Sequence, residues 1–331
     1  LAGVLCLFGF CLLAQKPIQN RKQKVQTDTT KVQKAPATAP QKQPAKSKVY
    51  LIHSDLLRKD SRHPDAQVVV GNVVFRHDSV YMYCDSAYYY DKISSFEAFS
   101  NVKMNQGDTL FLYGDRLYYD GNTQIAEVRM NVRMENRNTT LLTDSLNYDR
   151  VYNLGYFFDG GTLMDEQNVL TSEWGQYNPG TKQSVFNYNV KLVNPQFTLT
   201  SDTLEYNTAS KIANIVGPSD ILSDNNHIYS EKGTYNTVTG KAYLLDRSVL
   251  TNEGKQLTGD SLFYDRNEGL GEAFRNMVLT DTINKNMMTG EYGFYNEKRG
   301  YAFATDKAVA IDYSQGDSLF LHGDTLLMET F

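Results

Sequence analysis

Carboxylates are the side chains whose spacing in this sequence comes closest to supporting chemistry. The regularly spaced acids are Asp85, Asp115, Asp144, Glu173, Asp202, Glu231, Asp260, Glu291 and Asp324. Their successive separations are 30, 29, 29, 29, 29, 29, 31 and 33 residues. A pair of carboxylates can work as general acid and base, but these acids recur singly beside turns. We therefore interpret them as corner residues that accept backbone N–H groups of turns, and not as catalytic groups.

The other groups that could react or bind metal are isolated. The histidines, His53, His63, His77, His227 and His322, show no metal-ligand spacing. A nucleophile elbow, a phosphate loop and a Cys–His arrangement are all missing from the sequence. Cys84 is expected to be a small buried hydrophobic residue. We predict that the protein is not an enzyme and holds no cofactor and no metal.

Each regularly spaced acid opens a short motif of acid, any residue, Leu or Gly, any residue, Tyr, and Asp or Asn. Clear copies are GDRLYYD at 114–120, TDSLNYD at 143–149 and SDTLEYN at 201–207. After a polar turn, a second segment alternates apolar and polar residues, as in Ala126, Val128, Met130, Val132 and Met134. Alternation with a period of two is typical of a strand with one dry face. The sequence predicts about nine strand–turn–strand units of about 29 residues.

Stacking these units would build two inward columns, because the Leu/Gly and Tyr positions are two apart and share one face of a strand. One unit cannot bury its apolar face alone, whereas a stack of units can. We therefore predict an all-β, elongated repeat structure with a continuous apolar interior. Gly175, Gly233 and Gly293 replace Leu in one column, which predicts free space there.

The two ends of the chain differ from the repeat. Residues 1–15 carry no charge and are predicted to be the core of a cleaved signal peptide whose start is clipped. Residues 16–48 are predicted to be a basic flexible linker. Residues 49–65 are predicted to be a lead-in, a short segment that precedes the repeats, in which 51–60 could form one turn of helix. The repeat domain spans 66–331 and stops part-way through a unit, which predicts that it continues. After residue 48 the chain holds 24 basic and 37 acidic residues, a net charge of −13, which argues against nucleic acid as a partner.

The repeat motif, together with a second motif of Ala, three residues and Asn-Val, resembles the OstA-like repeats of lipopolysaccharide-transport proteins. Those repeats occur in LptA-type periplasmic bridge proteins and in the N-terminal domain of LptD-type proteins. The second motif is seen at Ala126 to Met134 and around Asn72-Val73. The resemblance implies a V-shaped β-jellyroll, a periplasmic location and a role as carrier or bridge for lipopolysaccharide. It also implies end-to-end strand addition with other Lpt-type proteins or with further copies of the chain.

In that interpretation, lipid A acyl chains lie in an apolar groove along the long axis. The residues predicted to line the groove are Leu117, Tyr119, Val132, Met134, Leu146, Tyr148, Tyr177, Val190, Leu192, Leu204, Tyr206, Tyr235, Leu262, Tyr264 and Tyr295. The alternative is a structural or adhesive β-solenoid whose interior is packed and carries no lipid. The carrier predicts co-purifying lipid and open edge strands, whereas the solenoid predicts a filled interior.

Overall fold

The computed structural model describes residues 47–223, 225–246 and 248–329, which form antiparallel strands joined by short turns. Both the predicted signal segment, with Cys6 and Cys11, and nearly all of the predicted linker lie outside these residues. The long strands have 11 to 15 residues each: β3 (His63–His77), β4 (Val80–Tyr90), β5 (Ser95–Gln106), β6 (Leu110–Asp120), β7 (Ile125–Asn136), β8 (Thr139–Asp149), β13 (Gln183–Asn194), β14 (Phe197–Asn207), β23 (Leu270–Asp281), β24 (Asn286–Asn296), β25 (Tyr301–Asp312) and β26 (Leu319–Glu329).

The remaining strands have four or five residues each. They are β1 (Tyr50–His53), β2 (Leu56–Asp60), β9 (Leu154–Phe157), β10 (Gly161–Asp165), β11 (Asn168–Ser172), β12 (Trp174–Tyr177), β15 (Ile212–Ile215), β16 (Ser219–Ser223), β17 (Asn226–Ser230), β18 (Lys232–Asn236), β19 (Lys241–Leu245), β20 (Val249–Asn252), β21 (Lys255–Thr258) and β22 (Ser261–Asp265). One 3₁₀ turn, η1 (Asp91–Ile93), lies between β4 and β5.

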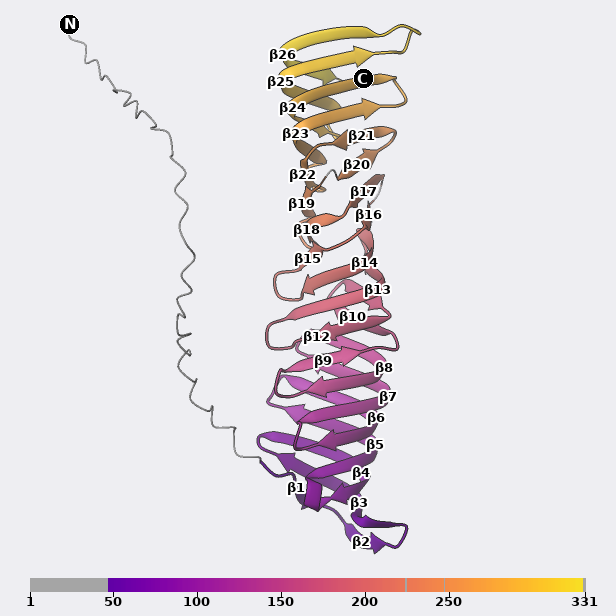
Figure 1. The fold of residues 1–331 in the computed structure, drawn as a ribbon, viewed down its shortest axis with the longest axis vertical. Helices are drawn as coiled ribbons and strands as arrows, with labels where there is room; N and C mark the ends of the chain where they lie inside the picture. Colours follow the sequence, from indigo (N-terminus) through magenta and orange to yellow (C-terminus); the bar gives the residue numbers. More distant parts are fainter. Residues whose placement is uncertain (1–46, 224, 247, 330–331) are drawn as a thin grey trace, which may run out of the picture. The chain divides into compact units, whose positions relative to one another are not determined.

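Two short strands in succession take the place of one long strand. The two halves of β8 pair with β9 and β10, which are separated by a break at residues 158–160. The same arrangement joins β14 to β15 and β16. The strands therefore stack in sequence order from β1 and β2 at one end to β26 at the other (Figure 1).

β3 and every later long strand that begins after a Tyr-Asp or Tyr-Asn pair are bent near the middle. In β7 the register with β8 shifts between Arg129 and Val132, and the intervening Met130 and Asn131 have φ values of 63° and 52°. Two consecutive residues in the left-handed region turn the strand and disrupt the ladder locally, as in a β-bulge. The same pair of positive φ values occurs at Ser100–Asn101, Tyr188–Asn189 and Arg275–Asn276. Asn tolerates this conformation better than most residues, which explains the recurrent Asn of the second motif.

The bend divides the stack into two arms. We call the turns that follow each Tyr-Asp or Tyr-Asn pair the tyrosine-side turns, and those at the other strand ends the opposite turns. The tyrosine arm holds the half-strands next to the tyrosine-side turns, and the opposite arm holds the other halves. The two arms pack face to face: Phe75 of the opposite arm stacks on Phe96 of the tyrosine arm with ring centroids 4.1 Å apart. Phe197 and Tyr235 make an equivalent contact at 4.7 Å. One continuous apolar core therefore fills the space between the arms.

Two local expectations differ from the structure. Met130 does not share the inward face with Val128 and Val132, since it sits in the bulge and its side chain is 50% exposed. Residues 51–60 form strands β1 and β2, both paired with β3, and not a helical turn. Asp55 also accepts a hydrogen bond from Asn72, as the acids of later units do from their own asparagines. Repeat geometry therefore includes part of the segment that the sequence suggested was a lead-in.

Candidate functional site

The predicted groove-lining residues all lie in the core between the arms. None of the fifteen exposes more than the 6% found for Tyr295. Their alternation along the strands explains this, because every second side chain points between the arms. The structure brings them together as a packed interior, and their role in holding lipid stays a prediction.

Register explains how the tyrosine column packs. Tyr119, Tyr148 and Tyr177 each lie opposite a small residue on a neighbouring strand, as Tyr148 does with Ala126 and Gly155. A small partner leaves room for each ring, and adjacent cross-strand pairs are the unit that stabilises a sheet. The column thus alternates large and small residues across strands.

The glycines of the Leu/Gly column do not leave free space, contrary to the sequence prediction. Gly175 lies between Phe157 and Phe186 in register, and a Cβ atom on it would come within 2.5 Å of Cζ of Phe157. At Gly293 a Cβ atom would lie 2.9 Å from Cε of Met277. Large neighbours fill each gap, so the interior is close-packed, as protein cores generally are.

The regularly spaced acids lie at the bends, but their partners differ from those expected. Asp85 accepts a hydrogen bond from Nδ2 of Asn101 at 2.7 Å, and Asp115 accepts one from Asn131 at 2.5 Å. The backbone N–H groups of the tyrosine-side turns are instead accepted by the residue after the tyrosine. Asn207 Oδ1, for example, accepts from the N–H groups of Ala209 and Ser210 at 2.9 and 2.8 Å.

The tyrosine-side turns meet the opposite turns along a line that we call the seam. The pairs that hydrogen-bond across it are Gln106 with Asn153, Asn136 with Lys182, Asp165 with Lys211, Asn168 with Thr237, Gln196 with Arg266 and Asn226 with Glu297. All of these contacts are between side chains. Over the described ranges, no backbone–backbone hydrogen bond crosses the seam.

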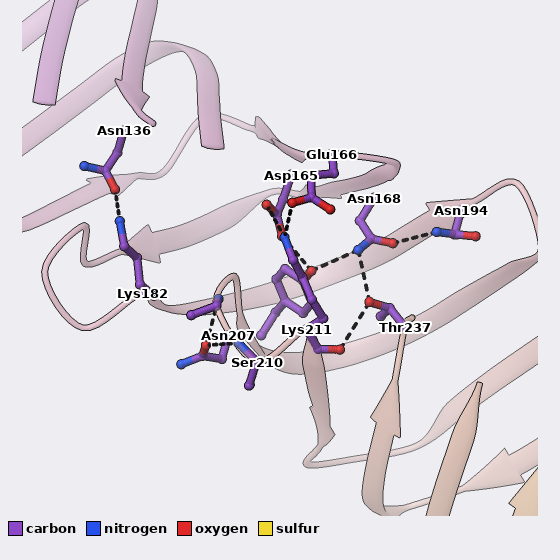
Figure 2. A network of polar contacts seen from close by, with 12 residues as sticks. Asn136, Asp165, Glu166, Asn168, Lys182, Asn194, Asn207, Ser210, Lys211 and Thr237 are labelled. Atoms are coloured by element: carbon purple, nitrogen blue, oxygen red, sulfur yellow. Dashed lines mark hydrogen bonds and ion pairs between the residues drawn. The ribbon is translucent and has the colours of Figure 1, made fainter. Parts of the chain in front are cut away.

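Tyrosine hydroxyl groups form the inner layer of the seam. Figure 2 shows the network around Lys211, whose Nζ lies 2.8 Å from both carboxylate oxygens of Asp165 and 3.3 Å from Oε1 of Glu166. The Tyr206 hydroxyl donates to Asp165 at 2.7 Å and accepts from Nδ2 of Asn168 at 2.9 Å. Each ring is therefore in the core while its polar tip faces the seam, an arrangement for which tyrosine is well suited.

Burial fixes the protonation of these hydroxyl groups. It raises the pKa of Tyr119 to about 12, although the Arg150 guanidinium, which donates to that hydroxyl at 2.5 Å, acts in the opposite direction. Burial likewise raises the pKa of Tyr235 to about 12, against the opposing charge of Arg266. For Tyr177 and Tyr206 burial is again the main cause of a raised pKa. The raised pKa favours the neutral form of Tyr119, Tyr177, Tyr206 and Tyr235 at physiological pH.

Cys84 is buried in the core, away from the seam. Cys84 is 5% exposed, and burial raises the pKa of its thiol to about 12. Deprotonation is required for a thiol to attack or bind metal, so Cys84 is a structural residue. In the part of the chain that the structure describes, no group of three or more His, Cys, Asp or Glu side chains could hold a metal ion. No helix there is both long and apolar enough to cross a bilayer.

A profile of the family described as OstA-like protein matches residues 46–202 and 198–260, well over half of the chain. The chain belongs to the OstA-like family. The match covers the bent strands from β3 to β13, the tyrosine column as far as Tyr235 and the seam from Asn136 to Lys211. It begins at residue 46, which agrees with the repeat geometry seen in β1 and β2.

Among solved structures, the OstA-like chain is similar to LptH from Pseudomonas aeruginosa, described as the LptA homologous periplasmic component of the conserved lipopolysaccharide transport device. The two share 17% sequence identity over 30% of this chain and 78% of LptH, with a TM-score of 0.28. A comparison with curated proteins returned no significant match.

Proposed function

We propose that this OstA-like protein is a periplasmic carrier or bridge for lipopolysaccharide that holds acyl chains between its two arms. The observation that carries the proposal is the combination of a continuous apolar interior with a seam closed by side chains alone. Membership of the OstA-like family is the second support. In this role the protein transports lipid and catalyses no reaction.

Magnitudes favour opening of the seam by a lipid. A neutral side-chain hydrogen bond contributes about 1 kcal/mol net and one to a charged group about 1.5–3 kcal/mol, so releasing the contacts of Asn136 with Lys182, Asp165 with Lys211 and Asn168 with Thr237 costs about 4–7 kcal/mol. Burying a methylene group gains about 0.8 kcal/mol, so an acyl chain of about ten methylenes gains about 8 kcal/mol. Backbone ladders within each arm stay intact in such an opening. The repeated chemistry of the columns gives adjacent positions similar affinity, which lets the lipid move along the stack.

End-to-end assembly by strand addition is a further part of the proposal, with β26 as the strand that would accept it. Among the described residues β26 pairs with β25 only, and Leu319, Phe320 and Leu327 on it are 70%, 55% and 62% exposed. An open edge can accept another strand by β-augmentation. The added strand would come from a following repeat or from another OstA-like module, including a second copy of this chain.

Lipid binding can be tested by native mass spectrometry of the protein mixed with lipopolysaccharide. The wild type should form a saturable adduct, and Leu204→Asp should lose it, because a charge in the core is strongly unfavourable. Leu204 is fully buried, whereas Thr200 on the same strand is exposed, so Thr200→Asp is the matched control and should retain the adduct.

Because Leu204→Asp can also unfold the protein, a photo-crosslinking residue provides an independent measurement. Placed at Tyr206 inside the core it should capture lipopolysaccharide, and placed at Tyr188, which is 64% exposed, it should not. Equal capture at both positions would place the lipid outside the interior. The close packing around Gly175 favours a second candidate function, a structural solenoid with a filled interior. A folded wild-type protein that forms no lipopolysaccharide adduct in native mass spectrometry would support the solenoid over the carrier.

A further inference from the structure

A cavity opens on the seam between the opposite turns at 136–139 and 165–167 and the tyrosine-side turns that end at Lys182 and Lys211. Its volume is about 330 Å³, and its charged lining residues are Arg137, Lys182 and Lys211 together with the carboxylates of Asp165 and Glu166. Thr139 and Thr208 also line it. The hydroxyl of Tyr177 lies beside it and hydrogen-bonds to Asn136 Oδ1 at 3.2 Å. The Tyr177 ring is 1% exposed, so the cavity and the apolar core meet at this residue.

The cavity holds more positive charge than its surroundings balance. Lys211 is paired with Asp165 and Glu166. Lys182 contacts the neutral Asn136 amide, and no carboxylate of the described residues lies within 4.0 Å of Lys182 or Arg137. Burial, with the positive charge of Arg137 as the second cause, lowers the pKa of Lys182, although the negative charge of Asp165 acts in the opposite direction. An anion bound at Lys182 would offset both the partial burial of the ammonium and its repulsion from Arg137.

The donors around the cavity match the chemistry of phosphate. The Arg137 guanidinium can donate two parallel N–H groups, and an ammonium provides a compact charge. Thr139 and Thr208 add hydroxyl donors at the inner wall. These groups stand out in a folded body that carries a net charge of −13 after residue 48.

We propose that this cavity binds the phosphate of an anionic lipid headgroup whose acyl chains enter the core next to Tyr177. This inference rests on the proposed function, since the chains need the interior. A phosphate that takes the Lys182 ammonium also breaks its contact with Asn136 across the seam. Headgroup capture therefore loosens the seam where the chains must pass.

The test compares two lipids that differ only in phosphate: lipid A, and the same lipid A after enzymatic removal of its phosphates, both in non-ionic detergent micelles. Affinities are measured for the full chain, for Lys182→Met and for Lys191→Met. Methionine keeps an unbranched apolar stem and removes the charge. Lys191 is exposed on β13, is the next lysine after Lys182 along the chain, and serves as the control.

The wild type and Lys191→Met should bind the phosphorylated lipid about tenfold more tightly, as loss of a hydrogen bond to a charged group predicts. Lys182→Met should lose most of this preference while its affinity for the dephosphorylated lipid stays unchanged. Equal binding of both lipids by the wild type would overturn the headgroup site and leave the carrier function standing. Binding of neither lipid would overturn the carrier function and this inference together. Inorganic phosphate that binds as tightly as lipid A would show a free-phosphate site and overturn the lipid assignment.

Discussion

At the residue scale, tyrosine links the core of this protein to its polar seam. Tyr206 shows the arrangement: a fully buried ring, with a hydroxyl that donates to Asp165 and accepts from Asn168. Phenylalanine would fill the same space but would leave the buried Asp165 carboxylate with one hydrogen bond fewer. Loss of a partner for a buried charged group costs more than the hydrogen bond itself contributes. Tyrosine at this position therefore serves both packing and polar satisfaction.

Alkaline titration should show that the tyrosine column ionises only when the protein unfolds. Burial raises the pKa of the column residues in the folded state above the unfolded value of about 10. Their contribution to stability is therefore present below about pH 10 and is lost as the pH rises through the folded-state values. Tyrosinate absorbance should show a late phase from the column residues that coincides with unfolding.

One variant assigns the late phase of that titration. Tyr206→Phe should reduce the late phase by one tyrosine, because burial raises the pKa of Tyr206. Ionisation of Tyr206 before the protein unfolds would contradict the assignment.

At the scale of the strand, the bend is the feature that makes two arms from one repeat. It depends on two consecutive residues with positive φ and on one hydrogen bond from the Asn to the acid of the preceding strand. The acid and the Asn are 16 residues apart in β6 and β7 and in the equivalent pair Asp260 and Asn276. This pairing gives the recurrent acid a structural role at the bend.

Substitution of Asn131 should destabilise the bend in two separable steps. Asn131→Ala removes the hydrogen bond to Asp115 and forces Ala into the left-handed region, at a total cost of about 1–3 kcal/mol in the free energy of unfolding. Asn131→Gly removes the hydrogen bond but tolerates the positive φ, so it should cost about 1 kcal/mol or less. Urea unfolding measures both. Equal losses for the two variants would mean that backbone conformation is not what Asn provides.

At the scale of the whole repeat body, the seam decides whether the interior is a core or a carrier. The six contacts between turns join residues that are 46–47 or 69–71 positions apart, so each one ties together different units of the stack. Because these contacts are between side chains, opening one stretch of the seam leaves the strand ladders intact. A local opening that moves along the stack would carry a lipid with it.

A cleavable cross-link across the seam should block lipid entry. Asn136→Cys with Lys182→Cys, joined by a short disulfide-forming bifunctional reagent, should lower lipopolysaccharide loading about tenfold or more, and a reductant should restore it. Cys6 and Cys11 are replaced by Ser in every variant. Cys84 should not react, because burial raises the pKa of its thiol to about 12.

The matched control for the cross-link is Lys191→Cys with Thr200→Cys. These two exposed residues are paired in register on β13 and β14, away from the seam. Bridging them should leave loading unchanged. Normal loading of the seam-bridged protein would mean that lipid enters by another route.

The repeat, the strands and the inward columns were all determined by local sequence. A period of 29 residues and an alternation of two place Leu204 and Tyr206 on one face wherever the strand lies, so their burial follows from pattern alone. Tertiary structure decided the rest. Gly175 loses its predicted space because Phe157 and Phe186 flank it in register, and Met130 turns outward because two left-handed residues break the alternation. The seam pairs, such as Asn136 with Lys182, depend on how far one arm is staggered against the other, and that stagger is set by the twist of the folded sheet and not by any spacing within one unit.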